Sequence, residues 1–499
     1  MKASIAAAVA LYLLQTPPPV RVELVEQSIP ELAAALDRGT VTSHALVQAY
    51  LDRIAKYDHE GPSLNAMIAL NPHALADADA LDAERRAGHR RGPLHGIPIV
   101  VKDNYDTADL PTTAGSIALR GSRPDRDAFQ VRRLRDAGVV IVGKTNLHEF
   151  ARGITTVSSL GGQTRNPYDP TRNPGGSSGG TGAAVAADFA VAGLGTDTCG
   201  SIRYPAAHNN LVGLRPTLGL SSRSGIVPLA HSQDVGGPLA RTVVDVAILL
   251  DATAGPDPDD PVTRDAAAHI PASYRATLDG ASLAGARIGV VRSLFGREPE
   301  DQRAGSVVRT ALAALTARGT ELVDVDAGEF PSETDVSVIR YEFKFDLDEY
   351  LRRTPKAPVR SLAEILQKHL VLPALEAAFA RSNEIATLDT DEYRAARRRQ
   401  NDLRARLLTR LDENRLSALA YPTLRRTAAK IGEPQTGGNC AASAATGLPA
   451  ITVPAGFADD GMPVGLELLG RPYAEAELLR LAYAYEQATH HRRRSALVP

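Results

Sequence analysis

The sequence of 499 residues predicts an α/β sandwich from the order of its expected elements, and its composition and charge indicate the class of protein. Apolar, β-branched runs typical of buried strands alternate with segments that have a helical pattern. Hydrophobic residues make up 43% of the chain and charged residues 23%, which is the balance of an ordinary globular enzyme. The net charge of −2 gives no electrostatic footprint for nucleic acid.

The N-terminal part of the chain is expected to be a helical layer. Ser28 and Ser43 are predicted N-caps, and Gly39 is placed to end the first helix. The helices are expected at 30–37, 45–57 and 72–87.

The rest of the chain alternates between the two kinds of element. Strands are expected at 97–101, 139–142, 287–291, 321–325, 419–422, 450–454 and 464–469. Helices are expected at 128–137, 181–192, 302–317 and 475–487, with charged helical stretches at 335–353 and 361–410. The loop at 251–265 is rich in Asp and Pro and is a candidate subdomain boundary.

Two glycine-rich turns that carry serines flank the helix expected at 181–192. The first is 175–180 (GGSSGG), and the second is 196–203 (TDTCGSIR). Glycine tolerates the positive φ angles that bring successive backbone N–H groups together, and such groups stabilise a developing oxyanion. A flexible linker would not be interrupted by an apolar helix and strand, so the stretch predicts an active site.

A serine nucleophile needs a base, which is usually His and sometimes a desolvated Lys. Lys102 directly follows the buried strand expected at 97–101. Burial disfavours the ammonium form and would lower a lysine pKa from ~10.4 toward ~7–8. A lysine at a strand end is more often a solvated surface residue, so this assignment depends on the serines beside it.

Seven blocks in order, spread over about residues 28–487, resemble the amidase signature family. They are GIPIVVKDN (96–104), GKTNLHEF (143–150), GGSSGG (175–180), GTDTCGSIRYPAA (195–207), VGLRPT (212–217), GPLART (237–242) and GLPAITVPAG (447–456). The resemblance implies a large, twisted, mixed β-sheet core between layers of α-helices. It also implies a hydrolase that cleaves amides with a Ser-Ser-Lys triad and without a cofactor or metal.

Carried onto this sequence, the resemblance assigns Lys102 as the base, Ser177 as the bridging serine and Ser201 as the nucleophile. It implies a cis peptide bond at Gly176–Ser177. The backbone N–H groups expected to form the oxyanion hole are those of Thr198, Cys199, Gly200 and Ser201. The residues expected to support the turn from behind are Ser178, Asp197 and Arg203.

Cys199 occupies a position where the family usually has Gly, so the acyl pocket is expected to be unusual. The other cysteine, Cys440, lies just before the 447–456 block, which packs near the site in this family. The resemblance therefore suggests that the two sulfur atoms are neighbours and could pair.

Other motifs point elsewhere. Residues 138–145 fit the P-loop pattern, but their central residues form an apolar strand rather than a loop, which excludes nucleotide binding. Ser177 also fits G-x-S-x-G, yet proline-rich loop precedes it instead of the strand of a nucleophile elbow, so an α/β-hydrolase is a distant alternative. His208 and His231 are interpreted as structural or cleft-lining residues, and no His or Cys spacing predicts a metal site.

The domain organisation is expected to be simple. Residues 1–20 are either a signal peptide or a disordered N-terminus, so the protein is expected to be exported in the first case and cytoplasmic in the second. Residues 21–499 are expected to be one domain without membrane insertion. Its parts are N-terminal helices at 28–88, a catalytic core at 93–250 and 415–490, and a helical region at 330–410 that covers the cleft.

Within the family, segments 95–116, 161–168 and 341–351 are similar to bacterial peptide amidases, which deamidate peptide C-terminal carboxamides. The expected partner is a small-molecule or peptide amide, without nucleic acid, and the expected state is a monomer or homodimer. Three alternatives remain open: a glutaminase-type subunit of a tRNA-dependent amidotransferase, an aryl or aliphatic amidase or esterase, and a non-catalytic binding module.

Overall fold

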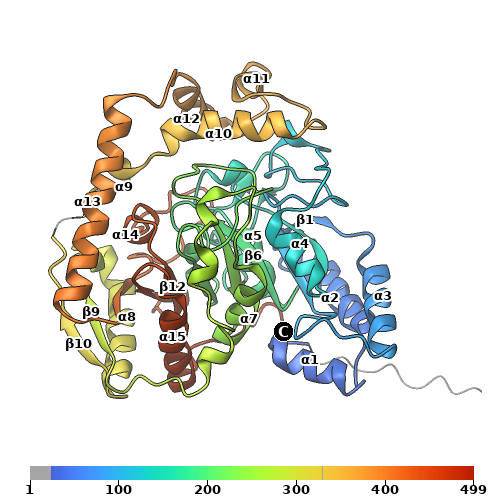
Figure 1. The fold of residues 1–499 in the computed structure, drawn as a ribbon, viewed down its shortest axis with the longest axis horizontal. Coiled ribbons are helices and arrows are strands. Elements are labelled where there is room, and N and C mark those ends of the chain that lie inside the picture. The colour runs from blue at the N-terminus through green and yellow to red at the C-terminus, as the bar shows by residue number, and fades with distance from the viewer. Residues whose placement is uncertain (1–23, 329) are drawn as a thin grey trace, which may run out of the picture.

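An eleven-stranded mixed sheet is the centre of the fold in the computed structural model, which describes residues 24–328 and 330–499 (Figure 1). In order across the sheet, the strands are β1 (Met67–Leu70), β3 (Val140–Thr145), β2 (Pro98–Lys102), β6 (Ala192–Asp197), β8 (Val235–Ala240), β7 (Val212–Arg215), β12 (Ala450–Phe457), β13 (Pro463–Leu469), β11 (Ala418–Pro422), β9 (Arg287–Val290) and β10 (Glu321–Asp324). A separate small sheet pairs β4 (Val157–Ser158) with β5 (Gly162–Gln163). The prediction for residues 1–20 lies outside the described residues.

The described residues also form helices, some of which cover the two faces of the large sheet while others lie beside it. They are α1 (Ile29–Asp37), α2 (Ser43–Tyr57), α3 (Ala74–Arg86), α4 (Phe129–Asp136), α5 (Gly179–Ala186), α6 (Arg203–His208), α7 (Val243–Thr253), α8 (Gln302–Thr316), α9 (Glu333–Val336), α10 (Ile339–Arg353), α11 (Leu362–Gln367), α12 (Pro373–Asn383), α13 (Asp391–Glu413), α14 (Ala441–Ala444) and α15 (Glu475–Thr489). The sandwich of helices around a mixed sheet is therefore confirmed.

Side-chain alternation along the strands divides the core between the two faces. On β2, Ile99 and Val101 pack into the cluster that holds α4, α7, α8 and α15, while Val100 packs with α5 on the other face. β2 lies between β3 and β6 and is parallel to both. Because parallel neighbours end at the same edge of a sheet, the ends of β2 and β6 bring Lys102 close to Thr196.

The helix starts were predicted in part. Ser28 forms a capping box with Glu31, as expected. Ser43 was the wrong cap for the second helix, because Thr42 accepts the capping hydrogen bond from the Ala45 N–H at 3.1 Å. Ser43 is instead the first helical residue, and its N–H donates to Asp82.

Several boundaries and strands differ from the expectation. α5 starts at Gly179 and ends at Ala186, so it is shorter than the expected 181–192 helix, and Ala192 already belongs to β6. Strands β1, β7 and β8 were not predicted. β8 contains two glycines and a proline, which hide a buried strand from a pattern based on β-branched residues.

After residue 330, helices α10, α11 and α12 form a layer at the top of Figure 1, and α13 runs down its left side. Phe343, Leu347 and Phe379 of α10 and α12 pack on Phe150 and Leu229 of the core. Among the described residues, no helix combines the length and the apolarity that a membrane crossing requires.

Candidate active site

Lys102 is the last residue of β2 and is fully buried. Its Nζ donates hydrogen bonds to Ser177 Oγ at 2.7 Å and to Thr196 Oγ1 at 2.7 Å. Asn104 Nδ2 also donates to Thr196 Oγ1, at 3.1 Å. The lysine is thus held between the first glycine-rich turn and the end of β6.

Burial lowers the pKa of Lys102 to about 7, although Asp197 and Asp234 act in the opposite direction. Desolvation destabilises the ammonium, because taking a charge out of water is costly without a direct counter-ion. A substantial fraction of the Lys102 amine is therefore neutral near pH 7 and can accept a proton.

The first turn contains the cis peptide bond that the resemblance implied, between Gly176 and Ser177. A side chain at Gly176 would meet the backbone of Ile154 at 2.7 Å, so this position requires glycine. The turn is joined to the second one through Ser178, whose N–H donates to the Ser201 carbonyl at 3.2 Å. The Ser178 hydroxyl contacts the Thr196 backbone at 3.2 Å.

Ser201 lies on the wall of a cavity of about 480 Å³. Its side chain is almost fully buried, and its Oγ makes no hydrogen bond to any described residue. The structure therefore makes the Lys102–Ser177 contact but not a hydrogen bond between Ser177 and Ser201.

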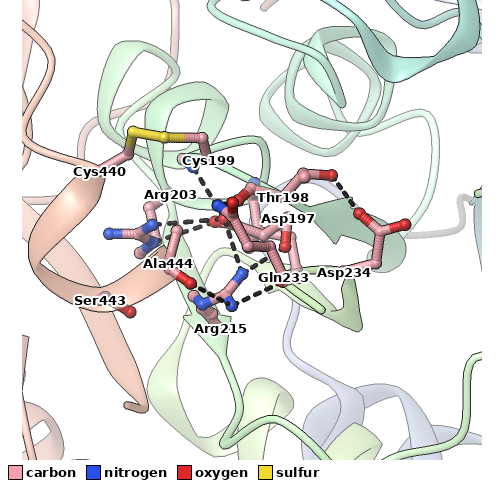
Figure 2. A network of polar contacts seen from close by, with 12 residues as sticks. Asp197, Thr198, Cys199, Arg203, Arg215, Gln233, Asp234, Cys440, Ser443 and Ala444 are labelled. Carbon is pink, nitrogen blue, oxygen red and sulfur yellow. Dashed lines mark hydrogen bonds and ion pairs between the residues drawn. A yellow bond between two sulfur atoms is a disulfide. The ribbon is translucent and has the colours of Figure 1, made fainter. Parts of the chain in front are cut away.

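A buried ionic network holds the second turn in place (Figure 2). The Asp197 carboxylate accepts from the N–H groups of Gly200 at 2.8 Å and Ile202 at 3.2 Å. It also pairs with Arg203 Nε at 3.0 Å and with Arg215 Nη1 at 3.1 Å. Burial alone would raise the pKa of Asp197, but the two guanidinium groups hold it well below its usual range.

The four N–H groups expected in the oxyanion hole are not equivalent. Those of Thr198, Cys199 and Ser201 make no hydrogen bond to another described residue. The N–H of Gly200 differs from the expectation, because it already donates to Asp197. In this arrangement three of the four N–H groups can receive a developing oxyanion.

Cys199 and Cys440 form a disulfide, so the suggested pairing is confirmed (Figure 2). Their Cα atoms are 5.0 Å apart, although 241 residues separate them in the sequence. The bond ties the second glycine-rich turn to the start of α14.

Two cavities meet at the second turn. The cavity that contains Ser201 shares Ala151, Thr198 and Leu229 with a cleft of about 680 Å³.

The two histidines considered in the sequence analysis lie in different surroundings. His231 lines the larger cleft and contacts Asp346 at 2.8 Å, whereas His208 is buried in α6, where burial lowers its pKa to about 4.

Several residues of the site were not singled out from the sequence. Thr196 contacts Lys102, Arg215 contacts Asp197, and Glu467 of β13 pairs with Arg203. The pairing of Glu467 could have been predicted from the sequence. Glu467 is a lone carboxylate inside the apolar run VGLELL, and such a group must be paired when it is buried. His231, Glu342 and Asp346 also cluster, with ligand atoms within 4.8 Å of one another.

Comparisons with known proteins agree with this geometry. The Amidase family model matches residues 45–479. A glutamyl-tRNA(Gln) amidotransferase subunit of Synechococcus is 37% identical over 93% of each chain. A probable amidase of Arabidopsis thaliana is 36% identical over 93% of this chain and 90% of that protein.

Among solved structures, native peptide amidase from Stenotrophomonas maltophilia superposes with a TM-score of 0.87. It is 41% identical to this chain, and the match covers 96% of this chain and all of that one. An amidase family protein from Bacillus anthracis is 33% identical with a TM-score of 0.85, over 94% and 92% of the two chains. The chain therefore belongs to the amidase signature family, and it is a hydrolase that cleaves the carbon–nitrogen bond of amides.

Proposed function

We propose that Ser201 is the nucleophile of this amidase, with Ser177 as the proton relay and Lys102 as the base. The observation that carries the proposal is the 2.7 Å contact between Lys102 Nζ and Ser177 Oγ, made by a fully buried lysine. A neutral amine in this position accepts the Ser177 proton while Ser177 takes the proton of Ser201.

The second contact of the relay, from Ser177 to Ser201, forms when the substrate binds. Catalytic hydrogen bonds often become short only in the Michaelis complex. Ser201 Oγ then bonds to the amide carbonyl carbon, and the N–H groups of Thr198, Cys199 and Ser201 stabilise the oxyanion. Asp197 and Arg203 hold the turn, and Ser178 joins it to the first turn.

The following steps pass the proton from Lys102 to the leaving group and then restore Ser201. The Lys102 ammonium passes its proton back through Ser177 to the leaving nitrogen, so ammonia or an amine departs and an acyl-enzyme remains. Water then attacks the ester carbonyl, gives a proton along the same relay and releases the acid with Ser201 restored.

The proposed substrates are peptides that end in a carboxamide. The support is the 41% identity and nearly complete superposition with the Stenotrophomonas peptide amidase. We also propose that residues 21–499 act as one domain and work as a monomer or homodimer. Several residues between 334 and 341, together with Arg381, line the Ser201 cavity, in keeping with a 330–410 region that covers the cleft.

A second candidate is a glutaminase-type subunit of an amidotransferase. The 37% identity to a glutamyl-tRNA(Gln) amidotransferase subunit over 93% of the chain favours it. An aryl or aliphatic amidase or esterase of the same family is the third candidate.

The test is ammonia release from a peptide C-terminal amide, a simple aliphatic amide and glutamine, with aniline release from an anilide. The wild type is compared with Ser201→Ala and with Ser306→Ala, an exposed serine on α8, as the matched control. Turnover of the peptide amide that is lost in Ser201→Ala and kept in Ser306→Ala supports the proposal.

Other outcomes of this experiment favour a different function. Turnover of glutamine alone, together with a stable complex with other proteins, favours the amidotransferase candidate. Turnover of the anilide or aliphatic amide alone favours the third candidate. Peptide amide hydrolysis that survives in Ser201→Ala would overturn the assignment of the nucleophile.

A further inference from the structure

Three arginines line the cavity beside Ser201, namely Arg152, Arg340 and Arg381. No Asp or Glu is found among the described residues of this lining. Arg152 follows the short helical turn Glu149–Ala151, Arg340 lies on α10 and Arg381 lies on α12. Three separate segments thus bring positive charge to one cavity wall, and the nucleophile proposed above lies on the same cavity.

None of these arginines forms an ion pair with a carboxylate that the structure describes. Arg152 is half-buried, and its Nη1 is buried without a hydrogen-bond partner. Its guanidinium carbon lies 5.5 Å from the ring centre of Phe343 and 5.9 Å from that of Phe379. Burial lowers the pKa of Arg152 to about 10, and the nearby positive charge of Arg381 acts in the same direction.

Several other buried or half-buried arginines are neutralised by a carboxylate. Arg203 pairs with Asp197 at 3.0 Å, Arg241 with Asp188 at 3.0 Å and Arg492 with Glu26 at 2.6 Å. A buried polar group without a partner costs free energy, so the unpaired Nη1 of Arg152 is a donor available to an anion.

The neighbouring 680 Å³ cleft has the opposite character. Seven carboxylates line it, and three of its four arginines are paired with a carboxylate: Arg126 with Asp259 at 3.1 Å, Arg223 with Asp260 at 2.5 Å and Arg353 with Glu349 at 2.5 Å. Arg123, the fourth, donates to the backbone carbonyl of Asp109 at 3.2 Å. Of these two cavities, the one that holds Ser201 is therefore the one whose described lining has arginines without carboxylates.

We propose that this arginine cavity binds a carboxylate of the substrate, so that the enzyme prefers peptide amides with an acidic side chain close to the terminal carboxamide. The inference rests on the proposed function. When ammonia is the leaving group, all the rest of the substrate belongs to the acyl part, and that part must occupy the cavities next to Ser201. Guanidinium groups match a carboxylate because their paired N–H donors can bind both of its oxygens.

The experiment uses peptide amides that are identical except for Glu, Gln or Lys at the last or the next-to-last residue. Hydrogen bonds to a charged group give the Glu peptide an expected kcat/KM roughly tenfold to a hundredfold above the Gln peptide at the favoured position. The Lys peptide is expected to be the poorest. Added salt is expected to reduce the Glu to Gln ratio, because it screens the charges of Arg340 and Arg381.

The variants are Arg152→Gln, Arg340→Gln, Arg381→Gln and the triple variant, with Arg318→Gln as an exposed arginine outside the cavity. The triple variant is expected to bring the Glu to Gln ratio to within about threefold of unity. Its circular dichroism spectrum should match that of the wild type, which shows that the enzyme is folded. Arg318→Gln should keep the wild-type ratio.

The outcomes separate this inference from the proposed function. Equal hydrolysis of the Glu and Gln peptides keeps the peptide amidase proposal and overturns the carboxylate site. A Glu preference that persists in the triple variant also overturns it. Failure to hydrolyse any peptide amide overturns the proposed function, and the carboxylate site with it.

Discussion

Lys102 Nζ lies 2.7 Å from Ser177 Oγ, in a position fully closed to solvent. The end of β2 fixes the lysine, and the cis peptide at Gly176–Ser177 belongs to the turn that presents the serine. The pair is thus set by backbone geometry rather than by flexible side chains.

The pH dependence of hydrolysis follows from this lysine. Only its neutral form accepts a proton, and its pKa is about 7. We expect kcat/KM to rise about tenfold per pH unit below that pKa and to level off above it. The pH profile of kcat/KM measures this, and a flat profile from about pH 5 to 9 would contradict the role of Lys102.

Lys102→Met is expected to lower kcat/KM by roughly 10²- to 10⁴-fold, the usual contribution of a general base. Lys430→Met, at an exposed position, serves as the control and should retain wild-type activity. Near-normal turnover in Lys102→Met would assign the base to another residue.

The two neighbouring serines of the first turn should behave differently. Ser177→Ala removes the group between Lys102 and Ser201, so kcat should fall by about 10²-fold or more. Ser178→Ala removes contacts with the Thr196 backbone and should act mainly on stability, by about 1 kcal/mol. Steady-state kinetics and urea unfolding of both variants measure this, and equal losses of kcat would be against it.

The Asp197 network is expected to be a major source of stability. Asp197→Asn leaves Arg215 without its carboxylate partner and should cost about 3–5 kcal/mol, as breaking a buried ion pair does. The exposed pair of Arg352 and Glu349 is the control, and Arg352→Gln should stay within about 1 kcal/mol. Urea unfolding at pH 7 measures both.

The stability that the Asp197 network contributes is expected to decrease at low pH. The pKa of Asp197 is lower in the folded than in the unfolded protein, so its contribution is fully present above the unfolded value of about 4. It is lost as the pH falls below that value. The stability gap between wild type and Asp197→Asn should therefore narrow under acid, and a gap that widens there would contradict the account.

The disulfide should stabilise the protein and support activity. It joins residues 241 positions apart, and removing such a native bond typically costs about 2–5 kcal/mol. We expect dithiothreitol to lower the Tm and the kcat of the wild type, because the N–H of Cys199 is itself one of the three proposed oxyanion donors. A Cys199→Ala, Cys440→Ala double variant should not respond to dithiothreitol. Two free thiols in the denatured, unreduced protein would exclude the bond.

The two glycine-rich turns of the candidate site could be predicted from the sequence. The residues that contact these turns from other parts of the chain were predicted less completely. The apolar run before Lys102 predicted β2. The glycines and serines at 175–180 and 196–203 predicted both turns. Strand β8 was missed because its glycines and proline lack a strand pattern. Thr196 and Arg215 were missed for a different reason. Their partners come from other parts of the chain, and only tertiary structure brings Thr196 to Lys102 or Arg215 to Asp197.

The helical layer formed by α10, α11 and α12 supplies Arg340 and Arg381 to the cavity wall, whereas Lys102, Ser177 and Ser201 all come from the sheet and its turns (Figure 1). In the proposed mechanism, two of the three cavity arginines therefore come from a stretch of the chain that holds none of the three catalytic residues. Segment 334–413 could be exchanged with that of another family member as a cassette. Such a chimaera would inherit the donor's preference for acyl groups while it keeps the pH profile of this enzyme, since that profile belongs to the buried lysine.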